Sequence, residues 1–345
     1  MIESEKFRII DDIIMHDNNM LSITKMCKIA GVSRSGYYSW KASEQARNLR
    51  EELDKQNFLK ILKAYQADGY AKGARSIYMQ LIHAETYFNL KKIRRLMKKY
   101  GLKCPYRGPN ESKRMAKAIK TNTVFENVVD RKFKEKGPRK ILLTDITYIF
   151  YGIHREKVCY LSTILDAYTK EILAYEISQN LKVEFVLDTV EKLLKDYGGE
   201  LDDTTIIHSD RGCHYTSKQF IEKLRDNDFV QSMSRRGNCW DNAPQESFFG
   251  HMKDEINECL RLSKDFESVK AQLEKWLDYY NNRRYQWDLA FLAPSEFYQY
   301  TKTGKYPLDI EKIKKKTADE TASFKRDFNA ACGETARGSA PNPEV

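Results

Sequence analysis

The segment ILLTDITYIFY, Ile141 to Tyr151, is the first of three β-rich runs that decide the fold. KVCYLSTILDAYT (Lys157 to Thr169) and EILAYEIS (Glu171 to Ser178) follow after short turns, so we expect three successive strands. A helical pattern, a strand at Thr204 to Asp210, a capped helix, a short strand and a last helix come next. The order β-β-β-α-β-α-β-α predicts a mixed α/β sheet, with one strand antiparallel between others that need crossovers.

This order matches a ribonuclease-H-like core, a mixed five-stranded sheet with flanking helices. We place it at residues 139–300. The chain has 345 residues, and single cores stop growing efficiently at about 250 to 300 residues, so further domains are expected. Small all-α modules of the helix-turn-helix type are predicted ahead of the core.

The first such module is predicted within residues 1–50. SITKMCKIAGVSRSGYYSWK, from Ser22 to Lys41, has two short helical patterns around Gly31, and Ser33 is placed to cap the second helix. A unit of this kind places its second helix in the major groove of DNA. A helical hairpin that binds nothing is the alternative.

A second helical module is predicted over residues 51–105. Apolar residues at helical spacing lie in GARSIYMQLIHAETYFNLKKIRRLMKKYGL, from Gly73 to Leu102, with Asn89 as a cap and Gly101 as a stop. The outward face of its last helix carries basic residues that could grip phosphates without reading sequence, at Lys91, Lys92, Arg94 and Arg95.

The net charge of +10 is concentrated in one window. Residues 91–140 contain eighteen Lys or Arg and four acidic residues, which is typical of a polyanion binder; a solvated basic surface is the alternative. Residues 106–138 are predicted to be a basic linker. Residues 301–345 have low apolar content, and we expect a partly disordered tail.

Composition excludes several classes of protein. No apolar run approaches the roughly 20 residues of a membrane span, and the N-terminus lacks the apolar core of a signal peptide, so a cytoplasmic protein without a membrane partner is expected. The seven cysteines are odd in number and never form a C-x-x-C pair, which argues against a disulfide framework and a cysteine-rich zinc site.

Three acidic residues occupy comparable places in the predicted core. Asp145 lies inside a strand, Asp210 closes a strand, and Glu246 opens the last helix, with 64 and then 35 residues between them. A cluster of carboxylates needs cations, and hard oxygen ligands select Mg²⁺ or Mn²⁺. The residues therefore indicate metal-assisted phosphoryl transfer. Other acids of the region fit exposed or capping roles: Asp166, Asp202, Asp203 and Asp241.

The same motifs carry a resemblance to a known family. The three acids with their 35-residue second interval, HSDRGCHYTS (His208 to Ser217), GNCWDNAPQESFFGHMKDE (Gly237 to Glu255) and YYNNRRYQWDLAFLAPSEF (Tyr279 to Phe297) resemble the insertion-sequence-three family of bacterial transposases, OrfB type. That family lies within the retroviral-integrase-like DDE superfamily. The resemblance covers about residues 20 to 300.

The resemblance implies a DNA transposase that cleaves and joins element ends by transesterification. Asp145, Asp210 and Glu246 match the catalytic, metal-binding triad, with two Mg²⁺ or Mn²⁺ ions, and Lys253 matches a basic residue of the family that follows the Glu by seven positions. The implied partners are double-stranded DNA (terminal inverted repeats and target), further copies of the chain, and a small upstream-encoded protein or fusion. The implied place of action is the bacterial nucleoid.

Further DNA contacts are predicted around these motifs, at Arg34, Arg235, Arg236, Trp240, Asn242, Arg283 and Arg284. Trp240 could stack on an unpaired base, or could pin its loop to the core. For the arginines that follow the helix AQLEKWLDYY, scaffold packing is the alternative.

Two other functions stay open from the sequence. A non-catalytic DNA-binding protein would keep the acidic core only as a scaffold. A metal-dependent nuclease on the same fold would use water in place of a DNA hydroxyl.

Overall fold

The structure is a computed structural model of the chain and describes residues 2–15, 20–105, 129, 136–234 and 242–337. The chain divides into two compact units, Met1–Leu62 with Glu311–Val345, and Lys63–Ile310. The predicted linker at residues 106–138 lies almost wholly outside the described residues. Among the described residues, no helix is both long enough and apolar enough to cross a membrane.

The first unit contains the predicted helix-turn-helix. Helices α2 (Ile23–Ala30) and α3 (Arg34–Ala42) are capped by the side chains of Ser22 and Ser33, and Gly31 ends α2 in the left-handed region, with φ of 65°. Helix α1 (Glu3–Ile14) precedes them, and all three share one small core: Phe7, Ile10, Met26, Cys27 and Tyr37. The two-helix prediction is confirmed.

The C-terminal segment of the first unit is helical. Helix α13 extends over Ile310–Arg337, so the prediction of a partly disordered tail is wrong for these residues. Ile313 and Thr317 are buried four residues apart, and the rings of Phe324 and Phe328 stack one turn apart. Helical spacing of these side chains, together with helix-forming Lys, Glu and Ala, outweighs the low apolar content.

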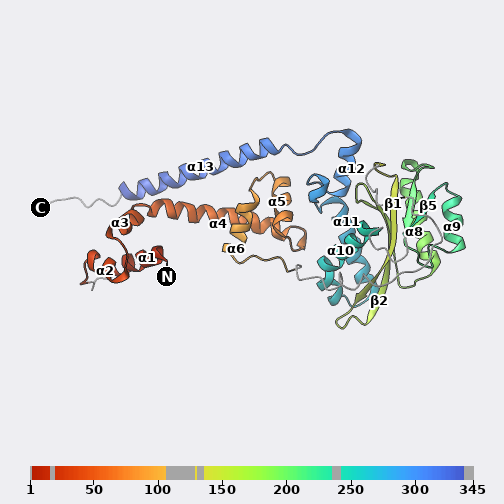
Figure 1. The fold of residues 1–345 in the computed structure, drawn as a ribbon, viewed down its shortest axis with the longest axis horizontal. Coiled ribbons are helices and arrows are strands. Elements are labelled where there is room, and N and C mark those ends of the chain that lie inside the picture. Colours follow the sequence, from red (N-terminus) through yellow and green to blue (C-terminus); the bar gives the residue numbers. More distant parts are fainter. Residues whose placement is uncertain (1, 16–19, 106–128, 130–135, 235–241, 338–345) are drawn as a thin grey trace. The chain divides into compact units, whose positions relative to one another are not determined.

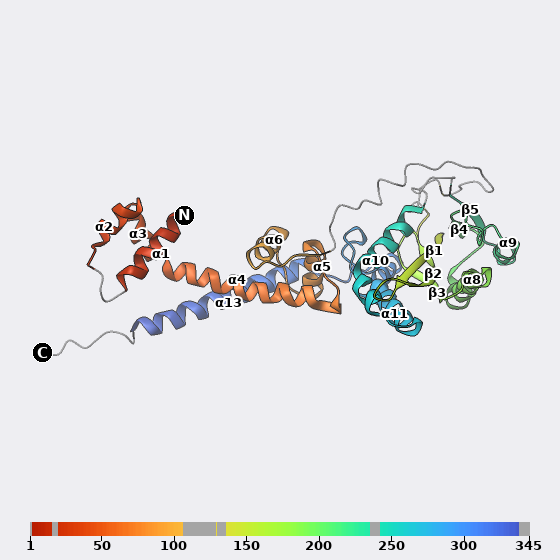
Figure 2. The same ribbon diagram turned by 90° about the horizontal axis from the view of Figure 1, so that it is seen from below.

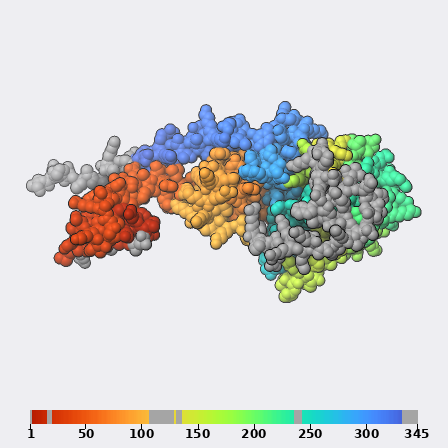
Figure 3. All heavy atoms as spheres, viewed as in Figure 1, coloured from red at the N-terminus to blue at the C-terminus, as the bar shows by residue number. Residues whose placement is uncertain are grey.

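The second unit begins with the predicted second helical module. The long α4 (Glu44–Gln66) contains the boundary between the units and leads through η1 (Ala67–Gly69) to α5 (Ala74–His83) and α6 (Leu90–Lys99). The side chain of Asn89 caps α6 as expected, and the inward residues of α6 are buried: Ile93, Leu96 and Met97. Figure 3 shows α5 and α6, in orange, at the surface.

The core is a mixed five-stranded sheet, as the sequence predicts, and its strands lie in the order β3-β2-β1-β4-β5. Its strands are β1 (Ile141–Tyr151), β2 (Lys157–Asp166), β3 (Ile172–Ser178), β4 (Ile206–Ser209) and β5 (Val230–Met233). Strand β2 is antiparallel to both β1 and β3, whereas β4 is parallel to β1 and β5. This mixed sheet with flanking helices is a ribonuclease-H-like core.

Helices cover both faces of the sheet (Figures 1 and 2). One face packs on α8 (Val183–Tyr197) and α9 (Lys218–Arg225), and the other on α10 (Ala243–Leu262) and α11 (Phe266–Asn282). The turns η2 (Gly198–Glu200) and η4 (Trp287–Leu289) and helix α12 (Pro294–Thr303) complete the unit. Alternate residues of each strand therefore enter different cores.

A buried ion-pair cluster ties the ends of several elements together. Arg139 is 4% exposed and pairs with Asp166 at 3.3 Å, Glu171 at 2.7 Å and Glu200 at 3.3 Å. Asp166 also accepts hydrogen bonds from Tyr168 N and Thr169 Oγ1, so it caps a turn as expected but is fully buried. This cluster has a structural role.

Candidate active site

The sheet places the first two acidic residues side by side. In the parallel pairing of β1 with β4, Thr144 lies opposite Ser209. Asp145 and Asp210 are the next residues on each side, so they occupy neighbouring positions just where β4 ends. Sequence spacing alone could not fix this register.

Alternation along the strands directs both acids to the same face. Leu143 and Ile149 of β1 pack in the core that contains α10, and Ile206 of β4 does the same. Asp145 has the parity of Leu143, and Asp210 has the parity of Ile206, so both face the α10 side.

Helix α10 brings the third acid to this face. Asn242 is the N-cap residue of α10, and Glu246 lies in its first turn and is exposed. The side-chain amide of Asn242 donates a hydrogen bond of 3.3 Å to Oδ2 of Asp145. The start of α10 is thus attached to the middle of β1.

The acids influence one another electrostatically. Burial first, and then the negative charge of Asp210, raise the pKa of Asp145 to about 7; Glu246 adds to this, while Lys253 and the Ile146 N–H oppose it. Loss of water also raises the pKa of Glu246, although its side chain is exposed. Crowded carboxylates of this kind favour a bound cation.

The side chains of the site are of the chemical type that binds a divalent cation. Carboxylate oxygens are the ligands that Mg²⁺ and Mn²⁺ prefer, and two carboxylates share one end of the β1–β4 pair. Among the described residues, no group of three His, Cys, Asp or Glu side chains lies close enough together to hold a metal ion. Glu246 therefore stands near the aspartates without completing a ligand set.

The loop after Asp210 orients its carboxylate. Gly212 N donates to Asp210 Oδ1 at 2.8 Å, and a Cβ on Gly212 would lie 3.0 Å from that same oxygen. Arg211 donates through Nε to the carbonyl of Ser234 at 2.8 Å, while its buried Nη1 has no hydrogen-bond partner in the described structure. Sequence reasoning did not single out Arg211.

Two residues of the motif after β4 have structural positions. His208 is fully buried and bonded to Ser232 Oγ at 2.9 Å and Ser234 Oγ at 3.0 Å, which links β4 to the end of β5. Tyr215 is buried in the core beneath α8 and α9. Neither serves the carboxylates directly.

Lys253 is exposed on α10, seven residues after Glu246 and therefore about two turns along the same face. The surrounding protein lowers the pKa of Lys253 by removing water, and the charge of Asp145 opposes that shift. The charge of Lys253 thus interacts with that of Asp145, and the contact of Lys253 with a DNA phosphate stays a prediction.

The predicted DNA contacts fall into different surroundings. Arg235, Arg236 and Trp240 lie outside the described residues. Arg34 opens α3, is exposed, and has its guanidinium 5.6 Å from the ring centre of Tyr38. Of the four contacts predicted on α6, Lys91, Arg94 and Arg95 are exposed, and Lys92 is partly buried over the ring of Phe88.

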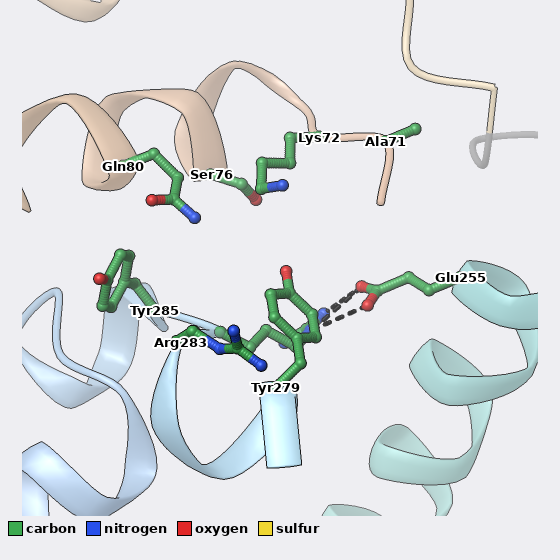
Figure 4. Close-up of a pocket in the computed structure, with 9 residues that line it drawn as sticks. Ala71, Lys72, Ser76, Gln80, Glu255, Tyr279, Arg283 and Tyr285 are labelled. Carbon is green, nitrogen blue, oxygen red and sulfur yellow. Dashed lines mark hydrogen bonds and ion pairs between the residues drawn. The ribbon is translucent and has the colours of Figure 1, made fainter. Parts of the chain in front are cut away.

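Arg283 and Arg284 line the same small pocket but differ in their surroundings; Figure 4 labels Arg283 and Glu255 there. Arg284 is 17% exposed and makes a two-pronged ion pair with Glu255, at 2.7 Å and 3.0 Å, which matches the scaffold alternative. Arg283 is about half exposed and pairs with Asp278. The pocket that they line with Lys72 has a volume of about 30 Å³, room for a water molecule but not for a nucleotide.

Two kinds of protein family match parts of the chain. The Integrase core domain family matches residues 135–239 and again residues 227–286, and the HTH-like domain family matches residues 52–110. The chain therefore contains a region similar to an integrase core domain, preceded by a region similar to a helix-turn-helix-like domain.

Individual relatives of the chain are encoded by bacterial insertion elements. The chain is 29% identical over 277 residues to the 31 kDa protein of insertion element IS600 from Shigella sonnei, covering 79% of this chain and 97% of the relative. It is 25% identical over 284 residues to the transposase InsF for insertion sequence IS3A from Escherichia coli K12, covering 80% and 93%. Over about four fifths of its length, the chain is thus similar to proteins encoded by bacterial insertion elements, one of them a transposase.

Solved integrases align with the core. The catalytic core domain of HTLV-2 integrase in complex with magnesium aligns with a TM-score of 0.34 and 15% identity, over 46% of this chain and 94% of that chain. The catalytic core domain of BIV integrase aligns with a TM-score of 0.37 and 15% identity, over 49% and 99%.

Proposed function

We propose that the protein is a DNA transposase that cleaves the ends of its own mobile element and joins them to target DNA by metal-dependent transesterification. The observation that carries the proposal is the neighbouring placement of Asp145 and Asp210 on the sheet face where α10 presents Glu246. The transposase relatives support the same reading.

In this proposal, Asp145, Asp210 and Glu246 hold one or two Mg²⁺ or Mn²⁺ ions. Such ions, when bound, activate an attacking oxygen and stabilise a leaving one in phosphodiester chemistry. The amide of Asn242 orients the Asp145 carboxylate, and Gly212 N orients that of Asp210. Lys253 holds a DNA phosphate beside them.

The joining step needs no covalent link to the protein. A 3′-hydroxyl at the element end attacks a phosphorus of the target; one P–O bond forms as another breaks, and the displaced 3′-oxygen takes up a proton. The number of phosphodiester bonds is conserved, so no external energy source is required.

DNA binding is assigned to the helical regions ahead of the core. Residues 1–50 and 51–105 hold double-stranded element ends through α3 and the basic face of α6, residues 106–138 connect them, and residues 139–300 carry the chemistry. Several copies acting on paired ends, with or without an upstream-encoded partner, fit this arrangement.

One assay distinguishes the candidate functions. The full chain is incubated with labelled DNA that carries the element ends, with target plasmid and with Mg²⁺, and products are separated on a denaturing gel. Joined products that disappear with EDTA support a transposase. Nicks without joining indicate the nuclease. A mobility shift on a parallel native gel, with strands that stay intact on the denaturing gel, indicates the non-catalytic binder; either result contradicts the proposal.

A further inference from the structure

The first turn of α10 makes a second attachment to the sheet, on the residue directly before Glu246. Nε2 of Gln245 donates a hydrogen bond to Oγ1 of Thr163 on β2. Both side chains are fully buried. Gln245 and Thr163 are 82 residues apart in the chain, so the bond fixes a tertiary relationship.

Thr163, which accepts this hydrogen bond, lies next to Asp145 in the sheet. In the antiparallel pairing of β1 with β2, Thr163 is the direct partner of Asp145. Opposite residues of antiparallel strands have Cβ atoms about 4.5 to 5.5 Å apart on one face. Gln245 therefore attaches α10 at the same level of the sheet as Asn242, which reaches Asp145 itself.

The amide of Gln245 is poorly suited to a purely stabilising role. Its Oε1 is buried without a hydrogen-bond partner in the described part of the chain, and the same is true of Oδ1 of Asn242. A buried polar atom without a partner lowers stability, and an apolar side chain of the same shape would avoid that cost. Gln245 is therefore less favourable for stability than an apolar side chain of the same shape would be at this position.

We propose that Gln245 and Thr163 form a positioning pair that fixes Glu246 relative to Asp145, so that the acids bind a divalent cation together. The pair acts through its neighbours and does not contact DNA or metal. This inference rests on the proposed function, because it assumes that the three acids are the metal site.

The test compares near-isosteric variants of the full chain. Gln245→Met and Thr163→Val each remove the bond with little change of volume, and Thr163→Ser keeps the hydroxyl. Thr189→Val is the matched control, because Thr189 Oγ1 donates at 2.9 Å to Ser162, the adjacent residue of β2, from α8 on the opposite face. All four side chains involved are buried.

Two measurements are made on each variant. Calorimetric titration with Mn²⁺ should show about tenfold weaker binding for Gln245→Met and for Thr163→Val, as is usual for groups that orient metal ligands. The double variant should be no weaker than either single variant. Hydrogen exchange should be faster in the peptide that spans residues 243–250, while Thr163→Ser and Thr189→Val should resemble the wild type in both measurements.

Each failure has its own signature. Wild-type Mn²⁺ affinity in Gln245→Met overturns the positioning pair, even if exchange is faster. Equal weakening by Thr189→Val overturns it too, because any lost buried bond would then have the same effect. If Asp145→Asn binds Mn²⁺ as tightly as the wild type, the proposed function fails; unchanged exchange in Gln245→Met would show separately that the attachment is absent.

Discussion

The Asn242 amide lies 3.3 Å from Oδ2 of Asp145, a residue 97 positions earlier in the chain, and so joins the N-cap of α10 to the middle of β1. Asn242 is 5% exposed. Asn242, which the sequence predicts to contact DNA, is hydrogen-bonded here to the carboxylate of Asp145. Its buried position favours a role in orienting Asp145.

Asn242→Ala should lower strand transfer by about 10- to 100-fold, the usual cost of losing a group that orients a metal ligand. The reaction is measured as joined product under single-turnover conditions. Asn257→Ala is the control, since Asn257 is exposed on the same helix and accepts a hydrogen bond of 2.5 Å from the exposed Arg155. Equal effects of the two substitutions would contradict the assignment.

The pH dependence of stability should report the protonation of Asp145. Burial and the charge of Asp210 raise the pKa of Asp145 to about 7, above the unfolded value of about 3.9, so the folded protein binds this proton more tightly. The tighter proton binding by Asp145 therefore stabilises the folded protein fully at acid pH, and this stabilisation is lost as the pH rises through about 7. The wild type in EDTA should lose up to about 4 kcal/mol relative to Asp145→Asn between pH 4 and 8.

Urea denaturation of both proteins across this pH range measures the difference. Mg²⁺ should reduce the loss in the wild type, because a cation favours the ionised carboxylate. Parallel stability curves for the two proteins would show that the proton is not held as described.

The buried Arg139 cluster should dominate the stability of the core. Arg139→Met leaves the buried carboxylates of Asp166 and Glu171 without their cation, which should cost about 3 to 5 kcal/mol in urea denaturation at pH 7. Arg261→Met, which breaks an exposed pair with Glu258, should leave the urea midpoint close to that of the wild type, because water screens an exposed ion pair. Similar midpoints for both variants would refute the structural role.

The exposed face of α6 should contribute to DNA affinity without sequence preference. Lys91→Ala combined with Arg94→Ala should weaken binding to all duplexes alike and reduce the slope of log K against log salt by about 2, one for each phosphate contact. Lys195→Ala on α8 is the control. An unchanged slope in the double variant would remove α6 from the DNA interface.

Local signals in the sequence predict much of the fold. Ser33 and Asn89 cap helices where predicted, and β1 follows its run of β-branched and aromatic residues, because caps and periodicity act over a few residues. The three acids could be found because Asp145 is a charged residue inside an apolar strand, Asp210 follows the end of a strand and Glu246 lies in the first turn of a helix. Their common face needed the register of Thr144 with Ser209.

Other features depend on contacts that no local pattern contains. Asp166 is buried because Arg139, 27 residues away, neutralises it, and Arg284 is withdrawn from the surface by Glu255, 29 residues away. The bond from Gln245 to Thr163 is equally non-local. Helix α13 is different, because a local pattern did exist. Apolar or buried residues recur at helical spacing (Ile313, Thr317, Phe324 and Phe328), but the polar composition of the segment led to a prediction of disorder.

The central claim is that three carboxylates perform strand transfer, and acid-to-amide substitution tests it most directly. Joined product is measured with Mg²⁺ for Asp145→Asn, Asp210→Asn and Glu246→Gln, with binding to the same end DNA measured in parallel. We predict that each variant binds DNA within about threefold of the wild type and joins at least about 1,000-fold more slowly. Joining at the wild-type rate by any of the three would contradict the triad.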